Sequence, residues 1–401
     1  MRKTISIILA AVMLAGCAKT PENVKNAQSS QAESRAELYT EGAITYADDL
    51  LIKQPETDAL YTFTLTPKKL PQAEALKVFD SYYEKYCAER MKGMDAENEK
   101  RFMGYDLMDT EKEYPQNYPA VSDYKNDIIS EKVKVDEIFI DNLKVYLVVR
   151  NGQLDFLNTG RAFEYLRQKG IGTEQSSISV SQPTWYCDIT AKYFTDSDDK
   201  VTLSDGEISI TQAKQKALGY VRELCGESQI KPVIPQVLVV DMKGQQGLSF
   251  VVSGEYEGVP LDAHEMKTAG IMRFGSYTNG KEYDNMPAAA FMMSSDSIDS
   301  ILANPCGYDV SDCSETDKRL TLKQALKIAD EKFSQQVRLK IYRAELVYTK
   351  QIIKDESGET KEYKCRPTWK FSANPAASAS RMFVYVDIIS GECYCYESRG
   401  Q

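Results

Sequence analysis

SITQAKQKA at residues 209–217 and TLKQALKIA at residues 321–329 are two similar stretches of the same chain. They open on Ser209 and Thr321, and a hydroxyl at this position can accept a hydrogen bond from a free backbone N–H in the first turn of a helix. Apolar residues then recur at the spacing of one helix face. Both lines therefore predict an amphipathic helix whose small residues allow it to lie close against a sheet.

The sequence that follows each predicted helix also keeps the same order. Runs rich in β-branched and aromatic residues alternate with turn residues, which is typical of antiparallel strands. Asn279-Gly280 ends the first series and Ser390-Gly391 ends the second, and both pairs favour a tight hairpin turn. The sequence thus predicts an α+β protein with tandem modules, each a helix laid on an antiparallel sheet.

Three stretches of the second module resemble the PepSY-type modules of bacterial extracytoplasmic proteins: LTLKQALKIADEKF (320–333), RPTWKF (366–371) and FVYVDIISGE (383–392). In that family the last hairpin of the sheet often reads V-D-x-x-[TS]-G, as residues 386–391 do here. The first module has FGSYTNG without the aspartate, so its similarity depends on order and spacing. The resemblance covers roughly 205–290 and 318–397, and such patterns are moderately specific. It implies a module that restrains a protease or modulates signalling.

The N-terminal third has a pattern of its own. LPQAEALKVFDSYYEKYCAERM (70–91) predicts an amphipathic helix with Pro71 near its first turn. Residues 134–157 predict strands with a hairpin at Asn151-Gly152. PTWYCDI at 183–189 echoes PTWKFSA in the second module, which either marks a third, degenerate module or is coincidence.

The first residues predict export from the cytoplasm. Arg2 and Lys3 precede an apolar run that is too short for a permanent membrane span, and LAGC follows, ending at Cys17. This motif resembles the bacterial lipoprotein box, which implies that Cys17 is lipidated and becomes the new N-terminus. The alternative is an ordinary signal peptide that contains a cysteine. As a whole the chain resembles bacterial lipoproteins.

These patterns divide the chain into five predicted segments. The polar stretch after Cys17 is too poor in apolar residues to fold, so it predicts a tether. The expected segments are a signal peptide (1–16), a tether (17–37), an N-terminal α+β domain (38–200) and two PepSY-like modules (201–300 and 301–401).

Charge restricts the partners of the chain. The formal net charge is −10 and falls to −12 when Arg2 and Lys3 leave with the signal peptide. Because phosphate contacts need clustered Lys and Arg, and no basic stripe is present in the sequence, we expect no nucleic-acid partner. Attachment to the membrane is expected to come from the lipid on Cys17 alone.

Eight of the nine cysteines follow Cys17, an even number that permits disulfides outside the cytoplasm. Cys306 and Cys313 flank GYDVSD, where a glycine favours a turn, so they are the best local candidates for a bridge. Cys393 and Cys395 would share one face of a strand, and either could meet Cys365 on a neighbouring strand. The alternative is that these cysteines are buried free thiols.

Catalytic and metal-binding motifs are incomplete. The chain has one histidine, His264, which excludes multi-histidine zinc sites and limits triad mechanisms to that residue. DSDDKVTLSDGE (196–207) has Lys200 and Val201 where a calcium loop needs a ligand and a glycine. We therefore expect no enzyme activity, no cofactor and no metal. The chain has 25 tyrosines and 2 tryptophans, and tyrosine is well suited to recognition surfaces. The candidates for such a surface are Tyr82, Tyr83, Tyr86, Tyr394 and Tyr396.

The leading functional hypothesis is a non-catalytic regulatory module on the extracytoplasmic face of a bacterial membrane, which binds a protein or another envelope component. The alternative is a ligand-binding lipoprotein of a transport system. That class has two doubly wound lobes with parallel strands. Here the predicted strands cluster in runs after each helix, which favours the first hypothesis. A hydrolase is the third hypothesis, and the single histidine disfavours it.

Overall fold

The structure is a computed structural model, and it shows an α+β protein with few helices and with mixed and antiparallel sheets. The described residues are 38–92, 103–107, 121–141, 145–170, 188–265, 276–278, 280–302, 304–317, 319–333, 337–375 and 381–398. The predicted signal peptide, the predicted tether and Cys17 lie outside them. Among the described helices, none is both long enough and apolar enough to cross a membrane.

The chain divides into two compact units. The first unit is formed by Met1–Pro55, Asp317–Leu346 and Thr368–Gln401, and the second by Glu56–Thr316 and Val347–Pro367. Each unit therefore combines segments that are far apart in the sequence. The predicted boundaries after residues 200 and 300 do not coincide with these units.

Helix α9 (Leu322–Phe333) of the first unit packs on an antiparallel meander whose first two strands are divided between the two units. Each strand pairs with the next along the chain, in the order β18 (Leu339–Lys354), β19 (Thr360–Pro375), β20 (Arg381–Asp387) and β21 (Cys393–Ser398). β1 (Thr45–Lys53) runs parallel to β18. The face of α9 that is buried carries the predicted apolar spacing: Leu322, Ala325, Leu326, Ala329 and Phe333.

The hairpin between β20 and β21 confirms the turn expected at Ser390-Gly391. Asp387 Oδ1 accepts hydrogen bonds from the backbone N–H groups of Ile389 at 2.9 Å and Ser390 at 2.8 Å. Gly391 has a φ of 73°, a left-handed conformation that favours glycine, and its N–H donates to the Asp387 carbonyl at 2.9 Å. The aspartate and the glycine of the motif thus have separate roles in one turn.

A ten-stranded sheet dominates the second unit, and all its described neighbour pairs are antiparallel. Its order is β3 (Met103–Leu107), β4 (Val135–Asp141), β5 (Tyr146–Arg150), β6 (Gln153–Asn158), β16 (Ser300–Leu302), β15 (Ala288–Met292), β11 (Gln245–Tyr256), β10 (Lys231–Met242) and β7 (Asp188–Tyr193), with β12 (Val259–Pro260) beside β11. Both faces are covered, because Val237 and Val239 of β10 join one core while Leu238 and Val240 join another.

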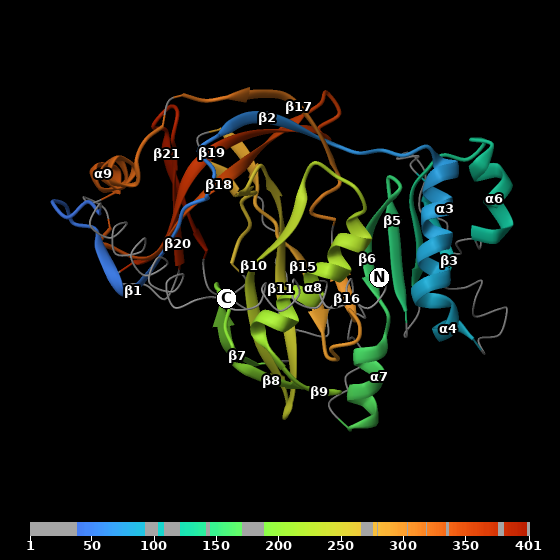
Figure 1. Cartoon of the computed structure of the whole chain (residues 1–401). Helices are drawn as coiled ribbons and strands as arrows, with labels where there is room; N and C mark the ends of the chain where they lie inside the picture. Colours follow the sequence, from blue (N-terminus) through green and yellow to red (C-terminus); the bar gives the residue numbers. More distant parts are fainter. Residues whose placement is uncertain are drawn as a thin grey trace, which may run out of the picture. The chain divides into compact units, whose positions relative to one another are not determined.

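Helix α8 (Ile210–Cys225) lies on the first of these faces, and it packs mainly on β10 (Figure 1). The meander that follows it is β10, β11, β15 and β16, so its layout matches that of α9 and its meander. Both helices also begin with the same reciprocal capping box. Ser209 Oγ accepts from Gln212 N–H at 3.2 Å, and Thr321 Oγ1 accepts from Gln324 N–H at 3.3 Å. The glutamine side chains accept from the two cap N–H groups in return.

The same layout occurs once more near the N-terminus. Helix α3 (Gln72–Tyr82) continues as the π-helical segment η1 (Tyr83–Cys87) and as α4 (Ala88–Met91), which confirms the predicted helix at 70–91. α3 packs on β4, β5 and β6 of the meander β3–β6 (Figure 1). β6 then pairs with β16, so this meander and the one after α8 form a single sheet.

The sequence of α3 supports a relation to α9. LPQAEALKVFD (70–80) and LTLKQALKIAD (320–330) share a leucine, the Ala-Leu-Lys run and the final aspartate at matching places. The extra module therefore comes from residues 70–158. It does not come from the echo at 183–189, of which only the last two residues are described, in β7.

Shorter elements complete the second unit. α7 (Arg161–Gln168) packs on the face of the sheet opposite α3 and α8. The remaining elements are α6 (Val121–Ile129), β2 (Tyr61–Pro67), β8 (Lys200–Leu203), β9 (Gly206–Ser209), β13 (Ser276–Thr278), β14 (Lys281–Asp284) and β17 (Tyr308–Glu315).

Of two predicted turns, one is confirmed and the other has a different place in the fold. A hairpin at Asn151-Gly152 is confirmed, with φ values of 52° and 77°, and it joins β5 to β6. β13 and β14 do form a hairpin, with Gly280 at a φ of 74°, but β14 pairs with β18. Asn279 lies outside the described residues. The hairpin that corresponds to Ser390-Gly391 is the one between β15 and β16, turned by residues 293–299. The predicted equivalence of Asn279-Gly280 and Ser390-Gly391 is therefore wrong.

The two capping boxes lead to a stability prediction. Thr321→Ala removes the oxygen that accepts the Gln324 N–H, so we expect the free energy of unfolding to fall by about 1 kcal/mol. Thr321→Ser keeps the oxygen, so its free energy of unfolding should stay within a few tenths of a kcal/mol of the wild-type value. Urea unfolding of both variants measures the difference, and equal losses would contradict the role of the hydroxyl.

Candidate functional site

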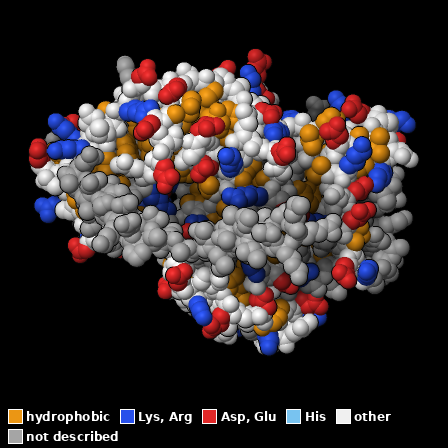
Figure 2. Space-filling view, in the orientation of Figure 1, with side chains coloured by type: hydrophobic (Ala, Val, Ile, Leu, Met, Phe, Trp, Pro, Cys, Tyr) orange, Lys and Arg blue, Asp and Glu red, His pale blue; other side chains and the backbone are white. Residues whose placement is uncertain are grey.

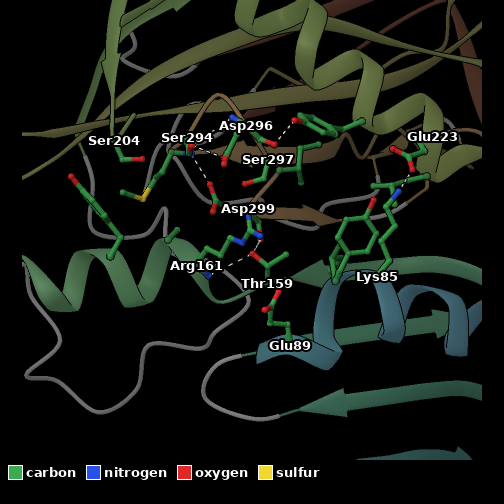
Figure 3. Close-up of a pocket in the computed structure, with 18 residues that line it drawn as sticks. Lys85, Glu89, Thr159, Arg161, Ser204, Glu223, Ser294, Asp296, Ser297 and Asp299 are labelled. Atoms are coloured by element: carbon green, nitrogen blue, oxygen red, sulfur yellow. Dashed lines mark hydrogen bonds and ion pairs between the residues drawn. The ribbon is translucent and has the colours of Figure 1, made fainter. Parts of the chain in front are cut away.

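A cleft of about 730 Å³ opens in the second unit where helices and loops from separate parts of the chain converge (Figure 3). Its walls come from η1, the end of β6, the start of α7, the last turns of α8 and the loop 293–299. The cleft thus lies where the α3 module and the α8 module share one sheet.

The loop 293–299 is held by two aspartates, one within it and one from another turn. Asp299 is 3% exposed, and its carboxylate accepts the Met293 N–H at 2.7 Å. Asp205, in the turn between β8 and β9, accepts the Ser295 N–H at 2.9 Å and the Ser295 hydroxyl at 2.7 Å. Burial raises the pKa of Asp205, but the hydrogen bonds from Ser295 outweigh it and leave that pKa below its usual value. The loop is therefore pinned at both ends and in its middle.

Helix α8 contributes a second wall. The Tyr220 hydroxyl donates to the Asp296 carbonyl at 2.5 Å, and Lys216 Nζ donates to the Ser295 carbonyl at 3.0 Å. Burial, followed by the charge of Asp296, raises the pKa of Tyr220. Since both contacts are made to backbone carbonyls, they fix the course of the loop against the helix.

The π-helical segment forms the wall opposite the loop. Lys85 of η1 makes an ion pair with Glu223 of α8, and its ammonium lies 5.0 Å from the centre of the Tyr86 ring. A π-helical turn is wider than an α-helical turn and frequently occurs at functional sites. Tyr86 and Glu89 line the cleft beside this ion pair.

The start of α7 positions an arginine. Gly160 has a φ of 71°, and its N–H donates to Asn158 Oδ1 at 2.8 Å, which turns the chain sharply from β6 into the helix. Arg161 is exposed, and its side chain extends into the middle of the cleft (Figure 3). One turn later, Tyr165 lines the cleft and donates to Gln245 Oε1 at 3.0 Å.

The cleft has the chemistry of a recognition surface. Three tyrosine rings, a cation and several carboxylates face one open space: Tyr86, Tyr165, Tyr220, Arg161, Glu89 and Asp296. Ser297 also lines the cleft, and its hydroxyl oxygen is buried without a hydrogen-bond partner among the described residues. The serine hydroxyls of the cleft have no imidazole beside them, because the single histidine, His264, is in the loop after β12. There its backbone N–H donates to the Asn285 carbonyl at 2.9 Å.

A second hollow of about 400 Å³ lies elsewhere in the second unit. Its most unusual member is Lys350, whose side chain is 7% exposed and forms an ion pair with Asp284 at 2.8 Å. The Lys350 ammonium also lies 6.0 Å from the ring centre of Tyr308 and 5.7 Å from that of Tyr363. The charges of Lys350 and Asp284 pair with each other beside the two rings, which indicates that this cluster stabilises the fold.

The structure separates Cys306 from Cys313, so the turn predicted between them is wrong. Residues 308–315 form the extended strand β17, which advances about 3.3 Å per residue, whereas a disulfide needs Cα atoms within about 7 Å. Cys306 is buried, and Cys313 is exposed with its Sγ 3.4 Å from the Tyr256 hydroxyl. Cys365 lies opposite Phe63, and Cys393 lies opposite Val386.

The calcium-like stretch 196–207 contains the hairpin β8–β9, and Asp196 forms an ion pair with Lys214 at 2.9 Å. Within the described ranges, no cluster of three or more His, Cys, Asp or Glu side chains could hold a metal ion.

Two of the five tyrosines singled out from the sequence are structural. Tyr82 donates to the Leu224 carbonyl at 2.9 Å, and Tyr394 is buried and stacks on Tyr385 with ring centres 5.1 Å apart. Tyr86 alone among those candidates lines the cleft, within the described residues. The sequence reasoning missed Arg161 and the loop 293–299. The serine- and aspartate-rich run SSDSID in this loop was the one available signal.

Charges of both signs alternate over the face shown in Figure 2. That distribution agrees with the acidic net charge of −10 and differs from the continuous basic stripe of nucleic-acid-binding proteins.

Comparisons with known proteins give one partial similarity. No family model matches the chain, and no curated protein matches it. Among solved structures, part of the chain is similar to the C-terminal domain of YpeB from Bacillus megaterium, with 12% identity and a TM-score of 0.19. The similarity covers 48% of this chain and 99% of that domain.

Proposed function

We propose that the protein is a non-catalytic interaction module, anchored by lipid on the extracytoplasmic face of a bacterial membrane, and that the cleft binds a peptide segment of a protein partner. The modules at α3, α8 and α9 are, in this proposal, three PepSY-like repeats. Their shared order of a helix and a four-stranded meander supports this reading, as do the capping boxes of α8 and α9.

The observation that carries the proposal is the placement of Arg161 among three tyrosines at the centre of an open cleft. Tyrosine rings bind at low entropic cost, and an arginine adds a planar donor set that matches a carboxylate. Lys85 is already paired with Glu223, so Arg161 is the cation better placed for a partner. We therefore expect the bound segment to carry an acidic side chain or a C-terminal carboxylate.

The alternative is a ligand-binding lipoprotein of a transport system. That class is built on parallel, doubly wound sheets. The described sheets here are antiparallel, apart from β1 beside β18 and an isolated bridge between Leu261 and Tyr348. The architecture therefore favours a protein partner over a small solute.

Charge reversal at the cleft tests the proposal. We expect Arg161→Glu to lower the amount of partner recovered by crosslinking and pull-down from membranes about tenfold or more, because it places like charges together. Arg319→Glu is the matched control, since Arg319 is also exposed but belongs to the first unit. Both variants should unfold at the wild-type temperature.

Three outcomes would speak against this function. Equal recovery with Arg161→Glu and wild type would exclude the cleft as the binding site. Recovery of no membrane or envelope protein by wild type would contradict the interaction module. A thermal shift produced by a sugar or a free amino acid, and lost in Arg161→Glu, would favour the transport alternative.

A further inference from the structure

The C-terminal end of α8 and the segment before β17 are held together by a small polar contact. Asn304 Oδ1 accepts the Cys225 thiol at 3.3 Å and the Cys306 N–H at 2.9 Å. The Ser228 hydroxyl donates to the Cys306 carbonyl at 2.8 Å. Two segments that are about 80 residues apart are thus fixed side by side, with a cysteine on each.

Both cysteines contact the same atom, Asn304 Oδ1, so they lie close together. Cys306 is 1% exposed and Cys225 is half-buried. The neighbouring Cys225 thiol, together with burial, raises the pKa of the Cys306 thiol. A disulfide needs two Cβ atoms about 4 Å apart on facing segments. Two cysteines held against one asparagine oxygen need little backbone movement to meet that condition.

We propose that Cys225 and Cys306 form a disulfide under oxidising conditions. With oxidised glutathione as the oxidant, the half-exposed Cys225 loses its proton and its thiolate attacks one glutathione sulfur, which expels the first glutathione thiolate. Cys306 then loses its proton and attacks Cys225 Sγ in the mixed disulfide, which expels the second. Two protein thiols are oxidised, and one glutathione disulfide is reduced to two thiols.

Competing partners are poorly placed. Among the described cysteines, Cys87, Cys365 and Cys393 are buried, Cys395 lies opposite Val384 in the β20–β21 hairpin, and Cys313 lies against Tyr256. The proposed bridge would close a long loop and join α8 to the connection between β16 and β17. An oxidising environment in the cell depends on the proposed extracytoplasmic location, but the bridge itself can be tested on the purified protein.

Peptide mapping tests the bridge. The full-length protein in mild detergent is equilibrated with oxidised glutathione, quenched with acid, denatured and alkylated with N-ethylmaleimide. Cys306 and Cys313 share the tryptic peptide 282–318, so chymotrypsin must also cut after Tyr308. We expect mass spectrometry to find the 225–306 crosslink as the main disulfide. We also expect the melting temperature to rise by about 5 °C on oxidation and to fall back with reductant.

Matched variants make the result decisive. Cys225→Ser should abolish both the crosslink and the temperature shift, whereas Cys313→Ser should keep both. If Cys225→Ser does not fold, the wild-type protein still decides the matter. Recovery of Cys225 and Cys306 as alkylated peptides after oxidation, or a main crosslink between Cys306 and Cys313, would overturn the proposal.

Discussion

Asp284→Ala is expected to lower the free energy of unfolding by about 3–5 kcal/mol, because it leaves the Lys350 ammonium buried without its carboxylate. Asp284 and Lys350 face each other on β14 and β18, and their side chains are 17% and 7% exposed. Two tyrosine rings lie about 6 Å from the ammonium and cannot replace a negative charge.

The same two strands provide a matched control. Glu282 and Lys354 form an ion pair at 2.6 Å, but their side chains are 34% and 47% exposed. Exposed pairs contribute little, so Glu282→Ala should cost less than about 1 kcal/mol. The double variant Asp284→Leu with Lys350→Met removes both buried charges and should recover most of the loss.

The loss caused by Asp284→Ala should depend on pH. Burial lowers the pKa of Lys350, but the charge and hydrogen bond of Asp284 outweigh it, so the folded-state pKa lies above the usual 10.5. The pair therefore stabilises the fold fully at neutral pH, and this contribution is lost as the pH rises through the folded-state pKa. The difference in the free energy of unfolding between wild type and Asp284→Ala should therefore become smaller in alkaline solution.

Urea unfolding at neutral pH and at alkaline pH measures both effects. A loss for Asp284→Ala no larger than that for Glu282→Ala would contradict the importance of burial for this pair. If the difference in the free energy of unfolding between wild type and Asp284→Ala grows as the pH rises, the raised pKa of Lys350 would be contradicted.

The helices at 209 and 321 could be predicted because each carries its start signal and its buried face within one short stretch. Ser209 and Thr321 both proved to be capping residues, and the apolar positions after them are buried. The final hairpin of the second module could be predicted for the same reason, since Asp387 and Gly391 belong to one turn. Signals of this kind can be recognised in the sequence because the residues that interact lie within one short stretch.

The module at α3 escaped detection because its cap and its turns have diverged. Pro71 stands at the N-cap where the other two helices have a hydroxyl residue, and it makes no side-chain capping bond. Asp80 keeps the place of Asp330 but not its contacts: Asp330 accepts the Ala43 and Ile44 N–H groups, whereas Asp80 pairs with Lys125. The shared leucine, the Ala-Leu-Lys run and the position of the aspartate are what remains of the relation.

The cleft could not be predicted, because its walls come from elements that tertiary structure brings together. Lys85 and Glu223 are paired although 138 positions separate them. The π-helical turn that places Lys85 has no distinct sequence pattern in an otherwise helical stretch. For the same reason, the sequence paired Cys306 with the nearby Cys313, whereas Cys306 and the distant Cys225 both contact Asn304.

Cys17→Ala is expected to move the protein from the membrane fraction to the soluble fraction. If Cys17 carries the lipid, the variant loses every acyl chain, and a body with a net charge near −12 has no electrostatic attraction for anionic lipids. The amount bound to membranes should fall to about a tenth of wild type or less, because stable anchoring needs the lipid chains.

Labelling and washing distinguish a lipid anchor from other attachment. Cells grown with labelled palmitate should mark wild type and the control Cys313→Ala equally, and should leave Cys17→Ala unmarked. Carbonate washing removes proteins held only by contacts with other proteins, so it should release Cys17→Ala from any partner that retains it. A variant that stays in washed membranes would show that the attachment lies in another part of the chain, and the proposed anchor would be wrong even if the cleft binds its partner as expected.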